Sequence, residues 1–331
     1  MIEPSSLELL HNKKNLLAFS GGADSTALFF LLREAKIPFD IAIVDYQIRK
    51  QSKQEVAHAK ELANIHNITC HTLQAPKITQ NFEANARAVR YDFFESLIQQ
   101  HGYQNLLTAH HLGDRFEWML MQFCKGAGCA ELVGMQKVQK RENYTLVRPL
   151  LHLDKQELLY FLHANKKEYF TDESNFDESI KRNEFRHQIT LPLLEKYLGG
   201  IKKSFEYLDT DATYLLQEVE IETIKDFAYF KSTLSERNDI FIIDKYLKTQ
   251  KYIMSAKERE RIRDEKSVVV GRVFLVVKEH GCIFITPYSS QTCNMPKDFK
   301  EKMRTLQIDP KLRPSLFNNS LACKRVEELL R

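Results

Sequence analysis

The sequence lacks the patterns that disulfide, zinc and iron–sulfur sites require. Its six cysteines are scattered, and no two of them form a Cys-x-x-Cys pair. This spacing argues against a zinc knuckle, an iron–sulfur cluster or a disulfide framework, and it favours a reducing compartment such as the cytoplasm. The cysteines are Cys70, Cys124, Cys129, Cys282, Cys293 and Cys323.

Long apolar runs are also missing. No stretch approaches the roughly 20 apolar residues that span a membrane. The first residues lack the pattern of a secretory signal peptide. We therefore expect no membrane partner and a cytoplasmic location.

The composition predicts a globular chain with an uneven charge. A length of 331 residues and a hydrophobic content of 43% indicate a substantial core divided over two or three domains. Residues 245–331 carry 19 Lys and Arg against 10 Asp and Glu, a net charge of +9, whereas the preceding part carries −5. A basic C-terminal part favours a polyanionic partner, although an ordinary solvated helical surface has a similar composition.

The chain is organised around one short stretch, residues 16–25. An apolar run enters two glycines, and residues 26–32 leave them with helical character. A strand, a tight turn and a helix start allow backbone N–H groups to converge on a phosphate. The carboxylate in this loop would repel a phosphate unless it receives a metal or a cationic group, or caps the helix. The candidate ATP-binding residues are Ser20, Gly21, Gly22, Ala23, Asp24 and Ser25.

This loop differs from the two commonest phosphate-binding motifs. No Gly-Lys-Ser/Thr follows, so it is not a Walker loop, and the third glycine of the dinucleotide fingerprint is missing. It resembles Ser-Gly-Gly-x-Asp-Ser, the pyrophosphate loop of the N-type ATP pyrophosphatases, which cleave ATP between the α and β phosphates. The alternative is a Gly-Gly turn capped by Asp or Ser.

The first half of the chain alternates between strand and helix patterns, which predicts a Rossmann-like α/β fold. The alternation indicates a parallel sheet with helices on both faces. Ligands of such sheets bind beyond the carboxyl ends of the strands, so the residues that follow each strand are site candidates. We expect strands at 15–19, 40–44, 68–72 and 105–109, and helices at 26–35, 52–67, 82–101 and 114–125.

Polar residues follow two of these strands. Arg49 follows the second, and His110 and His111 follow the fourth, just before Asp114 and Glu117. The two carboxylates lie three positions apart on one helix face, where they can hold Mg²⁺ or an ammonium group. The alternative is that Asp114 caps the helix and Glu117 favours its dipole. The histidine pair lacks the further ligands of a zinc site.

Basic residues are further candidates. Arg87 and Arg90 lie three apart on the helix at 82–101, where they suit phosphates, or alternatively pair with Glu83 on the surface. Glycines at 125–135 predict a lid or a close backbone approach. A polar loop then leads to a basic helix that can contact nucleotide or RNA, with Arg182, Asn183 and Arg186.

These motifs occur in an order that resembles the tRNA(Ile)-lysidine synthetases, a branch of the pyrophosphate-loop enzymes. The resemblance covers roughly residues 14–195. Its most specific part is Asp-x-Ser-Asn at 172–175 followed by Arg-Asn-x-x-Arg at 182–186. The other matching pieces are residues 20–25, Arg49, 81–91, 110–117, 125–135 and 148–151.

The resemblance implies a two-step ligation that forms a C–N bond. ATP adenylates the C2 oxygen of the wobble cytidine in an isoleucine tRNA with a CAU anticodon, and pyrophosphate leaves. The side-chain amine of free L-lysine then attacks C2 and expels AMP, giving lysidine. The resemblance also allows a homodimer.

The resemblance also implies roles for individual residues. Asp114 and Glu117 bind the ammonium groups of lysine, while Asp24 completes the acidic patch. Mg²⁺ is held through the ATP phosphates, with Asp24 or Asp114 as a further ligand. Arg87 and Arg186 position the triphosphate or stabilise developing charge, which makes five expected catalytic residues. The other site candidates are Arg49, Arg90, His110, His111, Arg182 and Asn183.

Two positions depart from the family pattern, and the C-terminal part matches it only weakly. Trp118 stands where a threonine is usual, and Tyr46-Gln47 stands where His-Gly is common. We expect a catalytic domain at 1–198, a helical linker at 199–232 with helix over 201–231, and a small basic α+β tRNA-binding domain at 233–331. Its strands are expected at 239–243, 267–277 and 282–287.

Two other functions stay open at this point. One is a different pyrophosphate-loop enzyme, such as a tRNA thiolase or an amidotransferase, but the cysteine pair of the first and the glutaminase module of the second are missing. The other is a non-catalytic RNA-binding relative. That alternative predicts loss of the acidic residues, whereas Asp24, Asp114 and Glu117 are all present.

Overall fold

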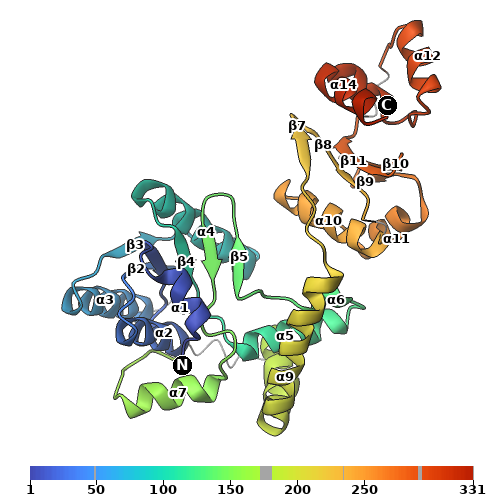
Figure 1. Ribbon diagram of the computed structural model, residues 1–331. Coiled ribbons are helices and arrows are strands. Elements are labelled where there is room, and N and C mark those ends of the chain that lie inside the picture. The colour runs from blue at the N-terminus through green and yellow to red at the C-terminus, as the bar shows by residue number, and fades with distance from the viewer. Residues whose placement is uncertain (48–49, 172–180, 234, 290–292, 331) are drawn as a thin grey trace. The chain divides into compact units, whose positions relative to one another are not determined.

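A computed structural model of the chain describes residues 1–47, 50–171, 181–233, 235–289 and 293–330. The chain divides into two compact units, Met1–Asp209 and Thr210–Arg331, whose elements are labelled in Figure 1. Among the described residues, no helix has both the length and the apolar character needed to cross a membrane.

The first unit is built on a six-stranded sheet with the order β3-β2-β1-β4-β6-β5. All neighbouring pairs are parallel except β5 and β6, which form an antiparallel edge. The predicted Rossmann-like parallel sheet is therefore confirmed. The strands are β1 (Asn15–Ala18), β2 (Phe39–Asp45), β3 (Cys70–Gln74), β4 (Asn105–Leu107), β5 (Val138–Lys140) and β6 (Thr145–Val147).

Helices cover both faces of this sheet. Successive strand residues point to opposite faces, so neighbouring side chains pack against different helices. Leu17 packs in one core cluster with Phe29 of α2, whereas its neighbour Leu16 packs in another with Phe94 of α4. The helices of this unit are α1 (Pro4–Leu10), α2 (Ala23–Glu34), α3 (Lys50–Ile65), α4 (Phe82–His101), α5 (Leu112–Phe123), α6 (Cys129–Leu132), α7 (Lys155–Ala164), α8 (Lys181–Phe185), the π-helical turn η2 (Arg186–Thr190) and α9 (Leu191–Leu215).

The second unit holds a separate five-stranded antiparallel sheet with the order β7-β8-β11-β10-β9. Two core clusters, one on each face, join it to helices, as expected for a small α+β domain. Its elements are β7 (Glu222–Ile224), β8 (Phe227–Lys231), α10 (Glu236–Thr249), α11 (Ala256–Asp264), β9 (Ser267–Val270), β10 (Phe274–Glu279), β11 (Cys282–Pro287), α12 (Lys297–Thr305), α13 (Arg313–Asn318) and α14 (Ser320–Leu329).

Two predicted elements of this region are wrong. The helix predicted over 201–231 ends at Leu215, because residues 227–230 are at most 2% exposed and form the buried strand β8. The strand predicted at 239–243 lies inside α10. The hydroxyl of Ser235 caps this helix by accepting a hydrogen bond from the Asn238 amide.

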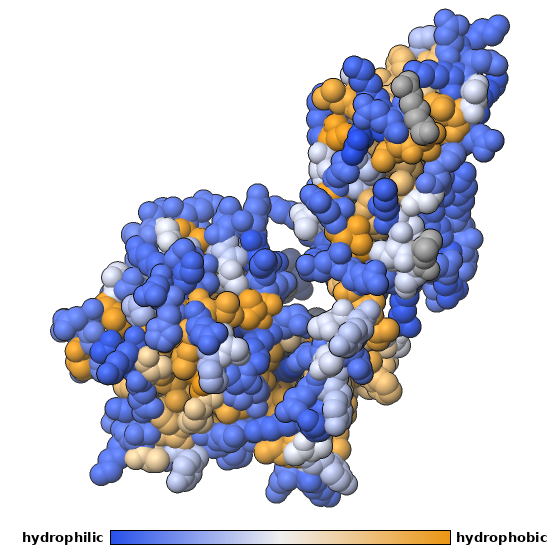
Figure 2. Space-filling model, in the orientation of Figure 1, coloured by the Kyte–Doolittle hydropathy of each residue, from blue (hydrophilic) through white to orange (hydrophobic). Residues whose placement is uncertain are grey.

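The basic stretch predicted near the C-terminus lies at the surface. Helix α12 buries only Met303, and its four basic side chains, Lys297, Lys300, Lys302 and Arg304, are exposed. Figure 2 shows that hydrophilic residues cover most of the visible face of each unit, with hydrophobic residues in smaller groups. Exposed cations on one helix suit contact with a polyanion.

Candidate active site

The phosphate loop lies between β1 and α2, at the carboxyl end of the central strand of the sheet. Gly21 has a φ of +76°, a left-handed conformation that glycine adopts without steric cost. The hydroxyl groups of Ser20 and Ser25 form a hydrogen bond of 3.0 Å, and the Ser20 amide donates a hydrogen bond to the Ser25 hydroxyl at 3.2 Å. The Ser25 hydroxyl also reaches the Gly22 carbonyl at 3.1 Å. These bonds hold the loop in shape before a ligand binds.

A segment from much later in the chain braces the loop. The Phe170 amide donates to the Gly21 carbonyl at 2.9 Å, and Gly22 forms a parallel bridge with Phe170. A Cβ atom added to Gly21 would lie 3.3 Å from the Phe170 ring. The loop therefore depends on both the glycine conformation and this ring.

A cavity of about 740 Å³ opens over the loop. It lies where the carboxyl ends of the parallel strands meet, the place at which open α/β sheets bind ligands. Its lining brings together three groups of predicted site residues, which are the phosphate loop after β1, the arginines Arg87 and Arg90 of α4, and His110 after β4. Polar and charged groups in the lining include Ser20, Asp24, Ser25, Tyr46, Glu55, Arg87, Arg90, Thr108, His110 and Lys155.

The two predicted carboxylates of α5 form one ion-pair network with two arginines. Glu117 is 1% exposed and accepts hydrogen bonds from the Nε atoms of Arg182 and Arg186, the latter at 2.7 Å. Asp114 lies 3.4 Å from Nη2 of Arg186 and 3.8 Å from Nη2 of Arg182. The predicted common face of Asp114 and Glu117 is thus occupied by two guanidinium groups.

Histidine 111 connects this network to the phosphate loop. Its Nε2 atom lies 4.0 Å from Asp24 and 3.6 Å from Asp114, and its Nδ1 atom accepts a hydrogen bond from the Gly113 amide. The cap of α5 is therefore His111, while Asp114 accepts from the His111 amide as the other half of a capping box. Burial would raise the pKa of Asp114, but the neighbouring histidines, that amide and Arg186 hold it well below its usual range.

The remaining predicted basic residues take different places. Arg87 lies over the Tyr91 ring at 4.7 Å and lines the cavity together with Arg90. Glu83, the alternative partner of Arg87, contacts Arg182 at 3.4 Å instead. Asn183 is buried on α8. Arg49 and the Asp-x-Ser-Asn motif at 172–175 lie outside the described residues.

Histidine 110 lies in a positively charged part of the cavity lining, where its Nδ1 atom is 2.9 Å from the Thr108 hydroxyl. Burial lowers the pKa of His110 to about 4. Asp114 opposes this change, and Arg148, Arg87 and Arg182 add to it. The imidazole is therefore neutral at physiological pH and serves as a hydrogen-bonding group, without adding charge to the site.

The protonation of His110 gives a testable pH dependence. Below its unfolded pKa of about 6.5, the unfolded chain binds a proton that the folded chain excludes, so stability falls as pH falls toward 4. We expect the wild-type protein to lose about 1–2 kcal/mol more unfolding free energy between pH 7 and pH 5 than His110→Gln does. Urea denaturation at both pH values measures this difference, and an identical pH dependence of the two proteins would contradict it.

Trp118, the departure from the family pattern, packs on the glycine-rich stretch. It does not line the cavity, and a Cβ atom added to Gly134 would lie 2.8 Å from its Cδ1 atom. Gly134 also has a φ of +64°. Trp118 therefore forms a contact between α5 and the stretch that follows α6.

This contact predicts a local effect of Gly134→Ala. The backbone of the alanine must keep the left-handed conformation of Gly134, and its methyl group must displace the indole of Trp118. The conformation alone costs about 1–2 kcal/mol. Trp118 is the one tryptophan of the chain, so its fluorescence reports the change directly. We expect an earlier urea midpoint and a red-shifted native emission, and an unchanged spectrum would show that the contact is not maintained in solution.

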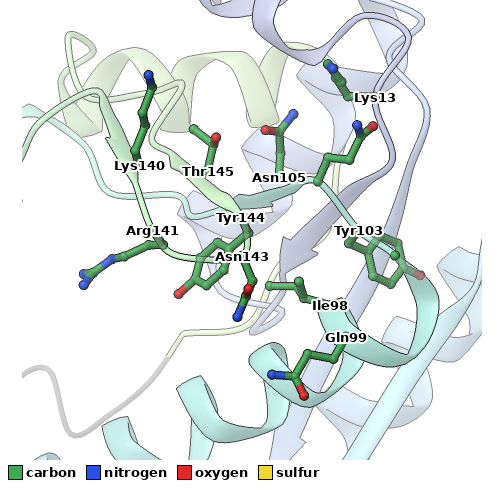
Figure 3. A pocket seen from close by; sticks show the side chains of 12 residues that line it. Lys13, Ile98, Gln99, Tyr103, Asn105, Lys140, Arg141, Asn143, Tyr144 and Thr145 are labelled. Carbon is green, nitrogen blue, oxygen red and sulfur yellow. The ribbon is translucent and has the colours of Figure 1, made fainter. Parts of the chain in front are cut away.

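A second cavity of about 680 Å³ lies at the opposite, amino-terminal edge of the sheet. Figure 3 shows its lining, in which Lys140 and Arg141 extend from the β5–β6 hairpin and Tyr103 and Asn105 precede or begin β4. It contains none of the predicted site residues. The sequence motifs therefore converge on one edge of the sheet and leave the other edge without them.

Comparison with known proteins agrees with this geometry. The sequence model of the PP-loop domain family matches residues 3–193. The chain is 43% identical over 312 residues to the tRNA(Ile)-lysidine synthase of Helicobacter pylori, covering 94% of this chain and 91% of that protein. The chain belongs to the tRNA(Ile)-lysidine synthase family. Other members of the family are the proteins of that name from Wolinella succinogenes, 43% identical over 96% of this chain and 97% of that protein, and Campylobacter jejuni, 39% identical over 97% of both.

Membership of the lysidine synthase family confirms the family resemblance and the pyrophosphate-loop fold predicted from the motifs. Sequence reasoning missed two contributors to the site. Lys155 follows Asp154, the N-terminal cap of α7, and contacts Asp24, while Phe170 braces the loop. Neither position carries a local signal, because each acts on a residue more than a hundred positions away in the sequence.

Proposed function

We propose that this protein ligates free L-lysine to C2 of the wobble cytidine of the isoleucine tRNA with a CAU anticodon, using ATP and releasing AMP and pyrophosphate. The observation that carries the proposal is the joining of the phosphate loop to the acidic pair of α5. His111 lies within 4.0 Å of Asp24 on one side and 3.6 Å of Asp114 on the other. Nucleotide chemistry and ammonium binding can therefore occur in one site.

The phosphate loop would support the first step. The C2 oxygen of the cytidine attacks the α-phosphorus of ATP, the bond between that phosphorus and the β-phosphate oxygen breaks, and pyrophosphate leaves. Loop amides, the N-terminus of α2 and the hydroxyls of Ser20 and Ser25 stabilise the charge on the leaving group. Arg87 and Arg90, which line the cavity, add positive charge at the phosphates.

A magnesium ion fits this arrangement. Mg²⁺ prefers phosphate oxygens together with one or two carboxylates, and Asp24 stands in the loop itself, with Asp114 beyond His111. Bound there, the ion would neutralise charge on the departing pyrophosphate. Asp24 is about one-third exposed, so its carboxylate is open to the cavity.

The acidic pair would support the second step. Asp114 and Glu117 attract the ammonium groups of lysine, which compete for these carboxylates with Arg182 and Arg186. A carboxylate accepts a proton from the attacking amine, the bond from C2 to nitrogen forms, and the bond from C2 to the adenylated oxygen breaks. Arg186 would stabilise the charge that develops on the departing AMP.

The basic surface of the second unit suits the tRNA partner. The exposed cations of α12 would contact phosphates, giving affinity that falls with added salt and carries little sequence information. The reaction needs ATP, free lysine and tRNA in one compartment, so we expect the protein in the cytoplasm. The homodimer allowed by the family resemblance stays a prediction, which light scattering can test.

Pyrophosphate release tests the proposed function. Purified protein with ATP and Mg²⁺ should release pyrophosphate when the CAU isoleucine tRNA transcript is added, and turnover should continue only with lysine present. A methionine tRNA transcript, which shares the CAU anticodon, serves as the control and should release little. Release that is independent of tRNA, or no release under any condition, would favour another enzyme or a non-catalytic relative.

A further inference from the structure

The carboxylate of Asp24 in the phosphate loop is paired with a lysine 131 positions later in the chain. Lys155 is the first residue of α7, and its Nζ atom lies 2.5 Å from Oδ1 of Asp24. Its side chain is 31% exposed and lines the same cavity as the loop. The ammonium group of Lys155 is therefore the cationic group that the Asp24 carboxylate contacts.

The pair lies where phosphate oxygens are expected. Ser20, Gly22, Ser25 and Lys155 line one wall of the cavity, and Arg87 and Arg90 line it from α4. On its other side, Asp24 lies 4.0 Å from the Nε2 atom of His111. Without Lys155, the Asp24 carboxylate would oppose an entering triphosphate in the centre of the loop.

Helix α7 is held in place without this ion pair. Its core side chains Leu158, Phe161 and Leu162 are at most 7% exposed and pack in the main cluster. Asp154 and Glu157 form a capping box at its first turn. An ion pair between two partly exposed side chains adds little to stability, so the position of Lys155 is not explained by folding.

We propose that Lys155 is a catalytic residue that binds the β- and γ-phosphates of ATP, the part that leaves as pyrophosphate, and that Asp24 holds its ammonium group in the loop until ATP enters. The inference rests on the ATP cleavage of the proposed function. The ammonium group keeps its proton and donates hydrogen bonds to phosphate oxygens, as lysines in other phosphate sites do. As the α–β bond breaks, its charge stabilises the electron pair that pyrophosphate takes.

Equilibrium dialysis of ATP and AMP against the full chain tests this inference. AMP lacks the phosphates that Lys155 is proposed to bind. We expect Lys155→Met to weaken ATP binding by about 10-fold or more and AMP binding by less than about 2-fold. Lys155→Arg should recover part of the ATP affinity. Lys140→Met, which removes the same charge from the second cavity of Figure 3, is the matched control and should bind ATP like the wild type.

Two results would overturn the inference. Equal losses for ATP and AMP would show that Lys155 only supports the fold of the site, and unchanged ATP affinity would show that it does not reach the phosphates. If the methionine variant fails to fold, Lys155→Gln provides the same comparison. Nucleotide binding needs neither lysine nor tRNA. If Lys155→Met weakens the binding of ATP but not of AMP, and the wild type nevertheless incorporates no lysine, this inference holds while the proposed function fails.

Discussion

Replacing Glu117 by glutamine is expected to lower lysine incorporation into tRNA by about 100-fold or more. Glu117 is 1% exposed and accepts hydrogen bonds from the Nε atoms of two arginines. The amide leaves Arg182 and Arg186 without their buried counter-charge and removes half of the carboxylate pair proposed to attract lysine. Breaking a buried ion pair in this way typically costs about 3–5 kcal/mol. Steady-state incorporation of labelled lysine, with thermal unfolding measured beside it, gives the effect.

Glu83→Gln is the matched control for this prediction. Glu83 also contacts Arg182, at 3.4 Å, but its side chain is 71% exposed. An exposed ion pair contributes at most about 1 kcal/mol, so we expect incorporation within about 5-fold of the wild type. Equal losses in the two variants would contradict the special position of Glu117 in the site.

Replacing Gly21 by valine is expected to abolish measurable ATP binding while the second unit stays folded. The φ of +76° at this position is a genuine outlier for a β-branched residue, and the new side chain meets the Phe170 ring at 3.3 Å. The loop must change shape, and its amides then no longer converge on a phosphate. We expect the ATP dissociation constant to rise by about 100-fold or more, measured by equilibrium dialysis.

Gly199→Val provides the control for the loop substitution. Gly199 is exposed in α9, and a Cβ atom there meets nothing within 4 Å. Valine and glycine are both modest helix formers, so stability should change by less than about 1 kcal/mol. Wild-type ATP affinity in Gly21→Val would show that the loop conformation is not needed for nucleotide binding.

Local sequence signals located most elements of the first unit. The helix predicted at 82–101 matches α4, which ends at Gly102 in the left-handed conformation typical of a C-terminal stop. Strand positions agreed within about two residues, and in β1, β2 and β4 buried apolar residues lie between polar turns. The antiparallel edge strand β5 was not predicted, since its three residues are only partly buried and pair with β6 alone.

The second unit was harder to predict because its elements depend on tertiary packing. The pattern that suggested one long helix over 201–231 includes residues 227–230, which become a buried strand between β7 and β11. The run at 239–243 has strand-like composition, but Ser235 caps a helix there and Asp239 accepts a hydrogen bond from the Thr233 amide at 2.8 Å. Local capping outweighed β propensity at this position.

The candidate site was predictable to the extent that its residues sit in local motifs. The phosphate loop, Asp114 with Glu117, and Arg182 with Arg186 follow from spacing, and the structure brings them to one edge of the sheet. Pairing between segments was not predictable. Lys155 reaches Asp24 across 131 positions, and no spacing rule connects residues that far apart.

The most direct test of the central claim is ATP-dependent transfer of radiolabelled lysine to the CAU isoleucine tRNA transcript, compared between the wild type and Asp114→Asn. The His111 amide donates a hydrogen bond to Asp114 at 3.1 Å, and the side-chain oxygen of asparagine can still accept it, so α5 keeps its cap. We predict acid-precipitable label with the wild type only when ATP is present, and a loss of about 100-fold or more in the variant. No label with the wild type, or equal label with both proteins, would contradict the account.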